Sequence, residues 1–148
     1  MTPTPNKRTK VITMSENIIT TFIVAGVVIS QDGKYLLVQE MKPSVRGQWN
    51  WPAGKVETGD TIERTAIKEA KEETGFDVEL VRKIDIYQHD TTRPVQHVFE
   101  AKIVGGAINF PKDEIMDVRW FTRAELETMK DNLRGEWILD AIQQLESN

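Results

Sequence analysis

Residues 54–76 read GKVETGDTIERTAIKEAKEETGF, and this stretch decides the fold. Thr61 can accept a hydrogen bond from the first turn of a helix, or Asp60 can do so together with Glu63 three residues later. Gly75 can end that helix, because glycine tolerates a left-handed backbone. Between these signals apolar residues recur at helical spacing, namely Ile62, Ala66 and Ala70. The stretch therefore predicts a loop followed by a helix that buries one face.

Three carboxylates lie on one side of the expected helix. Glu69, Glu72 and Glu73 stand at i, i+3 and i+4, which makes them neighbours on a helix surface. Their like charges repel, and Lys68 and Lys71 offset only part of that repulsion. A hard divalent cation such as Mg²⁺ takes carboxylate oxygens together with waters and substrate phosphates. The pattern suits a metal site, although an E-x-x-E-E run on a charged helix is more often only a solvated face.

The spacing of the whole stretch resembles the Nudix box, G-x5-E-x7-R-E-U-x-E-E-x-G-U, in which U is an aliphatic residue. The residues that match it outright are Gly54, Glu69, Glu72, Glu73 and Gly75. Ala70 and Phe76 occupy the two aliphatic positions, and Trp51-Pro52-Ala53 fits the family's approach to the box. The glutamates that bind metal in the family are thus all present.

Two departures from the box concern its scaffold. Asp60 replaces the first glutamate and Lys68 replaces the arginine, and in the family these two residues orient the loop against the helix. Asp60 is shorter, and Lys68 carries a point charge where arginine has a planar fork, so we expect a single, less directional contact. Their opposite signs predict that they pair and have a structural role.

The resemblance implies an α/β fold, an α/β/α sandwich around a mixed β-sheet, and hydrolysis of a phosphoanhydride with Mg²⁺ or Mn²⁺ as cofactor. It implies that Glu69, Glu72 and Glu73 bind the metal with the Gly54 carbonyl, and that one of these glutamates is the general base. It also places Lys55 against phosphate. Related proteins often add a carboxylate ligand where Glu114 lies, although an exposed loop acid explains this residue equally well.

Length and composition limit the function classes. A chain of 148 residues with 39% hydrophobic content and four tryptophans suits one domain of ordinary size. A formal charge of −4 argues against a general surface for a nucleic-acid polymer. The absence of cysteine excludes disulfides and thiolate sites, and no apolar run approaches the roughly 20 residues of a membrane span. We expect a cytoplasmic protein that acts on a small phosphorylated molecule.

The rest of the chain predicts strands, helices and an N-terminal tail. Residues 1–17 are polar and basic without the apolar core of a signal peptide, so we expect a flexible tail before a single Nudix domain at residues 18–148. Gln31-Asp32-Gly33 is typical of a hairpin turn. Strands are predicted at 20–30, 34–39, 78–88, 94–104 and 117–121, and helices after Thr122 with a capping Glu125 and over 137–145.

Substrate choice must be determined outside the box, which contacts only phosphate and metal. Lys42 and Arg46 could reach phosphate from the loop before the box. Trp49 and Trp51 could stack on a base, although tryptophans at such positions more often belong to the core. The other candidates are Tyr87, Phe99 and the stretch Asn132-Leu133-Arg134.

Several functions remain open from the sequence. The first is a MutT-like hydrolase of a nucleoside di- or triphosphate or a related diphosphate derivative, and a second is a hydrolase of a non-nucleotide pyrophosphate such as a thiamine-type diphosphate. A third is a non-catalytic nucleotide sensor, which usually lacks box glutamates or carries a DNA-binding domain. A plain interaction module would show no Mg²⁺-dependent turnover. A homodimer is a further candidate assembly.

Overall fold

The computed structural model describes residues 17–147. The tail expected at residues 1–17 therefore lies outside the described residues, except for Asn17. The strands are β1 (Ile23–Gln31), β2 (Lys34–Glu40), β3 (Trp49–Asn50), β4 (Ala53–Lys55), β5 (Phe76–Tyr87), β6 (Val95–Gly106) and β7 (Ile115–Thr122). The helices are α2 (Ile62–Thr74), α3 (Arg123–Thr128) and α4 (Trp137–Glu146), with short 3-10 helices η1 (Pro43–Val45) and η2 (Lys130–Asn132).

Strand β1 is the centre of a mixed seven-stranded sheet. It pairs in parallel with β6, and it pairs antiparallel with β2 at its end and with β4 at its beginning. Strand β5 lies beyond β6, while β3 and β7 both pair with β2. Because β4 joins the sheet through β1, the first residues of the Nudix box lie beside the central strand and next to α2.

The β1–β2 hairpin forms as the sequence predicts. Asp32 and Gly33 have positive φ angles of 53° and 76°, which match the turn type that two-residue hairpins favour. Residues then alternate between the two faces of the sheet. Leu36 packs in the core on the α2 side and Leu37 packs in the core on the opposite side.

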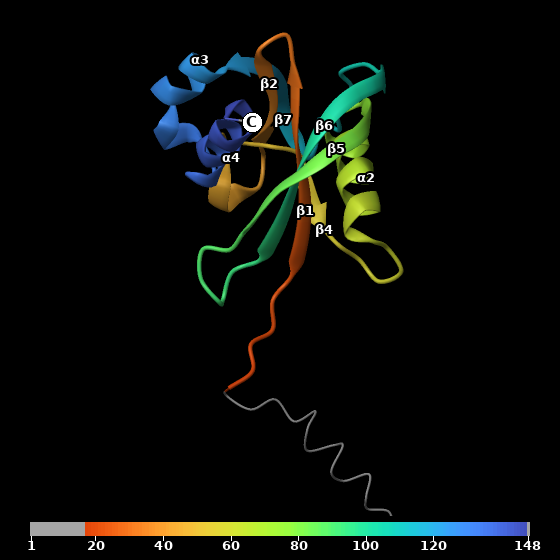
Figure 1. Ribbon diagram of the computed structural model, residues 1–148, viewed down its shortest axis with the longest axis vertical. Helices are drawn as coiled ribbons and strands as arrows, with labels where there is room; N and C mark the ends of the chain where they lie inside the picture. The colour runs from red at the N-terminus through yellow and green to blue at the C-terminus, as the bar shows by residue number, and fades with distance from the viewer. Residues whose placement is uncertain (1–16, 148) are drawn as a thin grey trace, which may run out of the picture.

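Helices cover both faces of the sheet. Figure 1 shows α2 on one side and α3 with α4 on the other. One buried cluster fills the space under α2, and it includes Val27 and Ala66. A second cluster includes Val98 and Ile138 and lies under α4. The fold is thus an α/β/α sandwich around a mixed sheet, as the resemblance implies. Within residues 17–147, no helix has the length and apolar character needed to cross a membrane.

The predicted helix ends are present. The Thr61 hydroxyl accepts a hydrogen bond from the Arg64 backbone N–H at 3.0 Å and so caps α2. Gly75 ends this helix in the left-handed region with φ of 91°, and its N–H donates to the Lys71 carbonyl. Thr122 forms the predicted capping box with Glu125 at the start of α3.

The predicted strands are found with their ends shifted by a few residues, but two short strands were not predicted. The sequence predicts a loop over the residues of β3 and for the approach to the box, where β4 forms. Both strands are only two or three residues long and carry Trp or Gly. Their pairing with β2 and β1 is long-range, so local strand preference gives no signal for them.

Candidate active site

Glu69 lies against Gly54 of strand β4. A Cβ atom added to Gly54 would overlap the Cδ and Oε1 atoms of Glu69. Only glycine leaves room for the carboxyl group at this point. Gly54 in the loop and Glu69 in the helix must therefore keep a fixed spacing in the sequence. Burial is the main cause that raises the pKa of Glu69 to about 7, and the neighbouring charge of Glu72 adds to it while Lys68 opposes it.

Glu73 follows one helical turn later and faces the same strand. Its Oε1 accepts a hydrogen bond from the Ala53 backbone N–H at 3.1 Å. Burial raises the pKa of Glu73 well above its usual range, and the charge of Glu69 raises it further. The Ala53 N–H opposes this shift, while the charges of Glu40 and Glu114 strengthen it. Negative charge from α2, β2 and the loop before β7 therefore gathers around this carboxylate.

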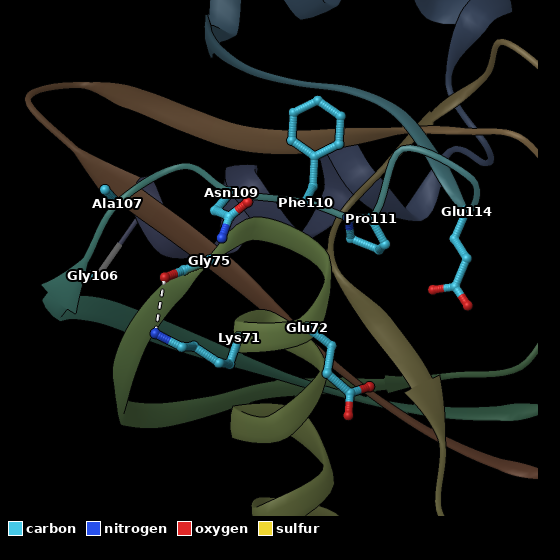
Figure 2. Close-up of a pocket in the computed structure, with 9 residues that line it drawn as sticks. All are labelled: Lys71, Glu72, Gly75, Gly106, Ala107, Asn109, Phe110, Pro111 and Glu114. Atoms are coloured by element: carbon cyan, nitrogen blue, oxygen red, sulfur yellow. Dashed lines mark hydrogen bonds between the residues drawn. The ribbon is translucent and has the colours of Figure 1, made fainter.

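Glu72 and Glu114 line an open pocket of about 720 Å³ between the end of α2 and the loop that follows β6. Figure 2 shows the two glutamates coming from different walls of this pocket, one from α2 and one from the loop. The loop is held against the helix because the Asn109 N–H donates to the Thr74 carbonyl at 2.8 Å. Glu114 therefore shares a pocket with Glu72 of α2, and its role as a metal ligand stays a prediction.

The three box glutamates differ in their surroundings. Within residues 17–147 no three acidic or histidine side chains already form a ligand set for a metal ion. Glu69 and Glu73 turn towards β4, whereas Glu72 is exposed in the pocket. The Glu72 charge nevertheless acts on Glu69, and the Glu69 charge acts on Glu73. Joint metal binding by the three glutamates stays a prediction.

The donor chemistry of the site nevertheless fits a hard divalent cation. The candidate donors are carboxylate oxygens, which suit Mg²⁺ or Mn²⁺. Glu73 has one backbone hydrogen bond and several negative neighbours, so its charged form lacks compensation in the protein alone. A cation among Glu69, Glu72 and Glu73 would provide that compensation.

Glu40, Asn50 and Arg134 form a second polar group beside these carboxylates. Arg134 Nη1 donates to Glu40 Oε2 at 2.6 Å, and Asn50 Nδ2 lies 3.4 Å from the same oxygen. Asn50 is a buried polar residue that also accepts a hydrogen bond from the Trp51 N–H. Sequence reasoning missed Glu40 and Asn50, because no spacing connects a strand end with a residue 94 positions later.

Asp60 and Lys68 lie together, as the altered box predicts. Lys68 Nζ is 3.4 Å from Asp60 Oδ2, but it is also 3.5 Å from Glu57 Oε1. Asp60 additionally accepts hydrogen bonds from Arg64 Nε at 3.0 Å and from the Thr61 N–H. The hydrogen bond from the Thr61 N–H is the main cause that lowers the pKa of Asp60, and the bond from Arg64 lowers it further. Asp60 and Lys68 thus make the expected single contact, and the additional partners Arg64 and Glu57 extend it into a small network at the loop.

Trp49 and Trp51 belong to the core. Their exposed fractions are 6% and 1%, and they pack in the cluster beneath α4. Trp49 meets Phe121 edge to face, with ring centroids 4.8 Å apart. This burial agrees with the core role that the sequence favours for both tryptophans, and it leaves no exposed indole face for the alternative of stacking on a base.

The remaining sequence candidates lie at several places. Lys55 Nζ lies over the Phe22 ring at 4.1 Å, and the Tyr87 hydroxyl donates to Asp140 Oδ2 at 2.7 Å. Arg46 is exposed in the loop after β2, and so is Lys42. Phe99 is buried in the core under α2, whereas Asn132 is exposed in η2. Contact of Lys55, Arg46, Tyr87 or Asn132 with substrate stays a prediction.

A sandwich with a glutamate-bearing helix packed against a glycine-containing strand is the arrangement of Nudix-type hydrolases. Residues 20–141 match the family described as NUDIX domain. The chain belongs to the Nudix family.

Relatives agree with this membership. The human protein named 8-oxo-dGDP phosphatase NUDT18 is 33% identical over 110 residues, which cover 72% of this chain and 34% of that protein. The MutT-like protein of Streptomyces ambofaciens is 32% identical over 119 residues, covering 80% of this chain and 75% of its own. A solved NUDIX hydrolase from Nitrosomonas europaea is 26% identical, with a TM-score of 0.76 over 86% of this chain and 90% of that one. The chain spans about a third of the length of its animal relatives.

Proposed function

We propose that this Nudix hydrolase cleaves the phosphoanhydride bond of a nucleoside di- or triphosphate in a reaction that depends on Mg²⁺ or Mn²⁺. The observation that carries the proposal is the placement of Glu69 and Glu73. Both carboxylates are held against β4, and burial raises the pKa of each. Such a pair destabilises the free protein unless a cation joins it, so it favours metal binding over a purely structural role.

Glu69, Glu72 and Glu73 would hold the metal, together with the Gly54 carbonyl and Glu114. When bound, a divalent ion supplies Lewis acidity towards phosphate oxygens and lowers the pKa of a coordinated water. The protein's own contribution is orientation. Gly54 leaves room for Glu69, the Ala53 N–H fixes one oxygen of Glu73, and one of the three glutamates takes the proton of the attacking water.

The substrate class that we propose is a nucleoside diphosphate with an oxidised guanine. This choice comes from the name of the human relative, 8-oxo-dGDP phosphatase, whose matching segment covers the whole box. That relative is about three times longer than the matched region, so its activity is carried over as a proposal for residues 18–148 acting as one catalytic domain. Any reader of the base must lie outside the box.

A panel assay tests the function. The purified protein is incubated with 8-oxo-dGDP, dGDP, dGTP, ADP-ribose and thiamine diphosphate, with Mg²⁺ or with EDTA, and products are quantified by chromatography and phosphate detection. We expect hydrolysis of at least one nucleotide only when Mg²⁺ is present, with 8-oxo-dGDP the best substrate. Binding of nucleotides without turnover of any of them would indicate a sensor and reject the proposal.

A further inference from the structure

The ion pair between Arg134 and Glu40 joins the end of β2 to the segment before α4. Its atoms are 2.6 Å apart, and the two side chains are 29% and 17% exposed. A half-buried ion pair is a weak source of stability, because removing both charges from water costs about as much as their attraction returns. The position of this pair therefore calls for another explanation.

The register of the sheet places Glu40 beside the site. Glu40 pairs with Ile115 in β7, and Ile115 directly follows Glu114. Asn50 contacts Glu40 and stands three positions before Ala53, whose N–H donates to Glu73. The Glu40 charge also acts on Glu73. Arg134 is thus one side chain removed from the carboxylates that we assign to the metal.

Arg134 is held in place but retains unused hydrogen-bond donors. Its backbone N–H donates to the Trp49 carbonyl at 2.9 Å, and the preceding Leu133 is buried. In the described part of the chain, Nη1 bonds to Glu40, while no partner is recorded for Nε or Nη2. A guanidinium anchored at one nitrogen can still donate to a second anion, since it carries five N–H groups.

Lys55 of the box lies over the Phe22 ring, whereas other basic side chains of the box pair with acidic groups. Lys68 binds Asp60 and Glu57, and Lys71 binds Asp77 and the Gly75 carbonyl. An anionic substrate that approaches several carboxylates needs positive charge beyond the metal. Arg134 is instead anchored by Glu40, whose charge acts on Glu73.

We propose that Arg134 anchors the phosphate chain of the substrate, with Glu40 holding its guanidinium in position. The inference rests on the proposed function and adds to it a residue outside the box. Guanidinium groups suit phosphate because two N–H donors match two phosphate oxygens. The pair with Glu40 reduces the rotamer freedom that Arg134 would otherwise lose on binding.

The test measures binding of an α,β-methylene nucleoside diphosphate, which the enzyme does not cleave, by isothermal titration calorimetry with Mg²⁺. We expect Arg134→Met to raise the Kd at least about tenfold, the scale of one charge-assisted hydrogen bond. Arg134→Lys keeps the charge but loses the planar pair of N–H donors, so its Kd should lie between those of the wild type and Arg134→Met. The control is Arg119→Met, because Arg119 lies over the Trp49 ring at 5.8 Å and pairs with Asp117 instead.

Inorganic pyrophosphate distinguishes phosphate from base. Pyrophosphate should inhibit hydrolysis as a competitor, and its affinity should fall in Arg134→Met by the same factor as that of the nucleotide. For the nucleotide substrate, KM should rise at least about tenfold in this variant while kcat changes less than about threefold. An unchanged Kd in a folded Arg134→Met or Arg134→Lys protein, or a loss seen with nucleotides but not with pyrophosphate, would overturn the assignment. A wild-type protein that neither binds nor hydrolyses any nucleotide would instead reject the proposed function.

Discussion

At Gly54 the missing side chain is what allows Glu69 to reach strand β4. A methyl group there would overlap the Glu69 carboxyl group. We therefore expect Gly54→Ala to displace Glu69, to lower kcat/KM at least about tenfold, and to cost about 1–3 kcal/mol of stability as an overpacked contact. Steady-state kinetics and urea unfolding measure both effects.

Gly105→Ala is the matched control for that substitution. A Cβ at Gly105 would meet only the Asp77 side chain, at 3.3 Å, and the backbone there does not require glycine. Its kinetics and unfolding midpoint should stay close to the wild type. Equal activity of Gly54→Ala and Gly105→Ala would contradict the assignment of Glu69.

Trp51 makes a separate prediction about stability. Its side chain is 1% exposed, and its indole nitrogen is buried without a hydrogen-bond partner in residues 17–147. Trp51→Ala should cost about 3–5 kcal/mol in denaturant unfolding because it opens a large cavity. Trp51→Phe should cost less, since it fills more space and removes the unpaired N–H. Selective loss of one substrate without loss of stability would show that the indole reads the base after all.

Residue-scale predictions from the sequence succeed where chemistry is local. The opposite charges of Asp60 and Lys68 indicated a contact that the structure contains. The roles of Trp49 and Trp51 could not be decided in this way, because an aromatic residue beside a motif suits a core as well as a ligand site. Burial depends on α4, more than 80 positions further along the chain.

At the scale of elements, the end of α2 and the loop after β6 form one unit. Gly75 has φ of 91°, and a Cβ there would overlap the Ala107 carbonyl and the Asn109 backbone. We expect Gly75→Ala to cost more than the roughly 1–3 kcal/mol of left-handed strain and to reduce activity, because the loop that carries Glu114 must move. Urea unfolding and kcat/KM are the measurements.

Gly33→Ala separates strain from overlap. Gly33 also has a positive φ, of 76°, but a Cβ there would meet nothing within 4 Å. The Gly33→Ala variant should therefore lose stability through backbone strain alone and keep its activity. If the two variants lost equal stability and both retained activity, the loop contact would have no role in the site.

Element prediction followed the strength of the local signal. Helix α2 carries a cap, an apolar line and a terminal glycine, and its bounds agree with the expectation. Strands β3 and β4 carry no such signal, because pairing with β2 and β1 alone makes them strands. Tertiary contacts override local preference in such short segments.

At the scale of the whole molecule, several acidic groups meet at one place, and this makes stability depend on pH. Burial raises the pKa of Glu69 to about 7 and that of Glu73 well above its usual range. Between the ordinary value near 4.5 and about 7, the folded state binds more protons than the unfolded state. Stability of the metal-free protein should therefore fall as pH rises through this window.

The measurement is urea unfolding in EDTA from pH 5 to pH 8. His97 acts in the opposite direction, because burial lowers its pKa. The useful quantity is thus the free energy of unfolding of the wild type minus that of the Glu69→Gln/Glu73→Gln variant. This difference should decrease with rising pH and should recover when Mg²⁺ is added at high pH. A difference that is constant across the range would show that the two carboxylates are not destabilised.

The most distant relationships were beyond sequence reasoning. The strand and helix pattern and the resemblance to the box predicted the class of fold, but the contact of Arg134 with Glu40 joins residues 94 positions apart. The Arg134 N–H bonds to the Trp49 carbonyl in β3, which pairs with β2. A stretch containing Arg134 could be named as a candidate reader. Its counter-ion Glu40 could not be identified from the sequence, because a glutamate at the end of a strand has the same local pattern as any solvated acid.

The most direct test of the account is hydrolysis of the best nucleotide substrate by wild type, Glu73→Gln and Glu63→Gln, each with Mg²⁺ and with EDTA. Glu63 is exposed in the first turn of the same helix and serves as the control. We predict that EDTA abolishes turnover, that Glu73→Gln lowers kcat at least about a hundredfold, and that Glu63→Gln stays within about twofold of wild type. Turnover that persists in EDTA, or a Glu73→Gln enzyme within a few-fold of wild type, would contradict a metal-dependent carboxylate site.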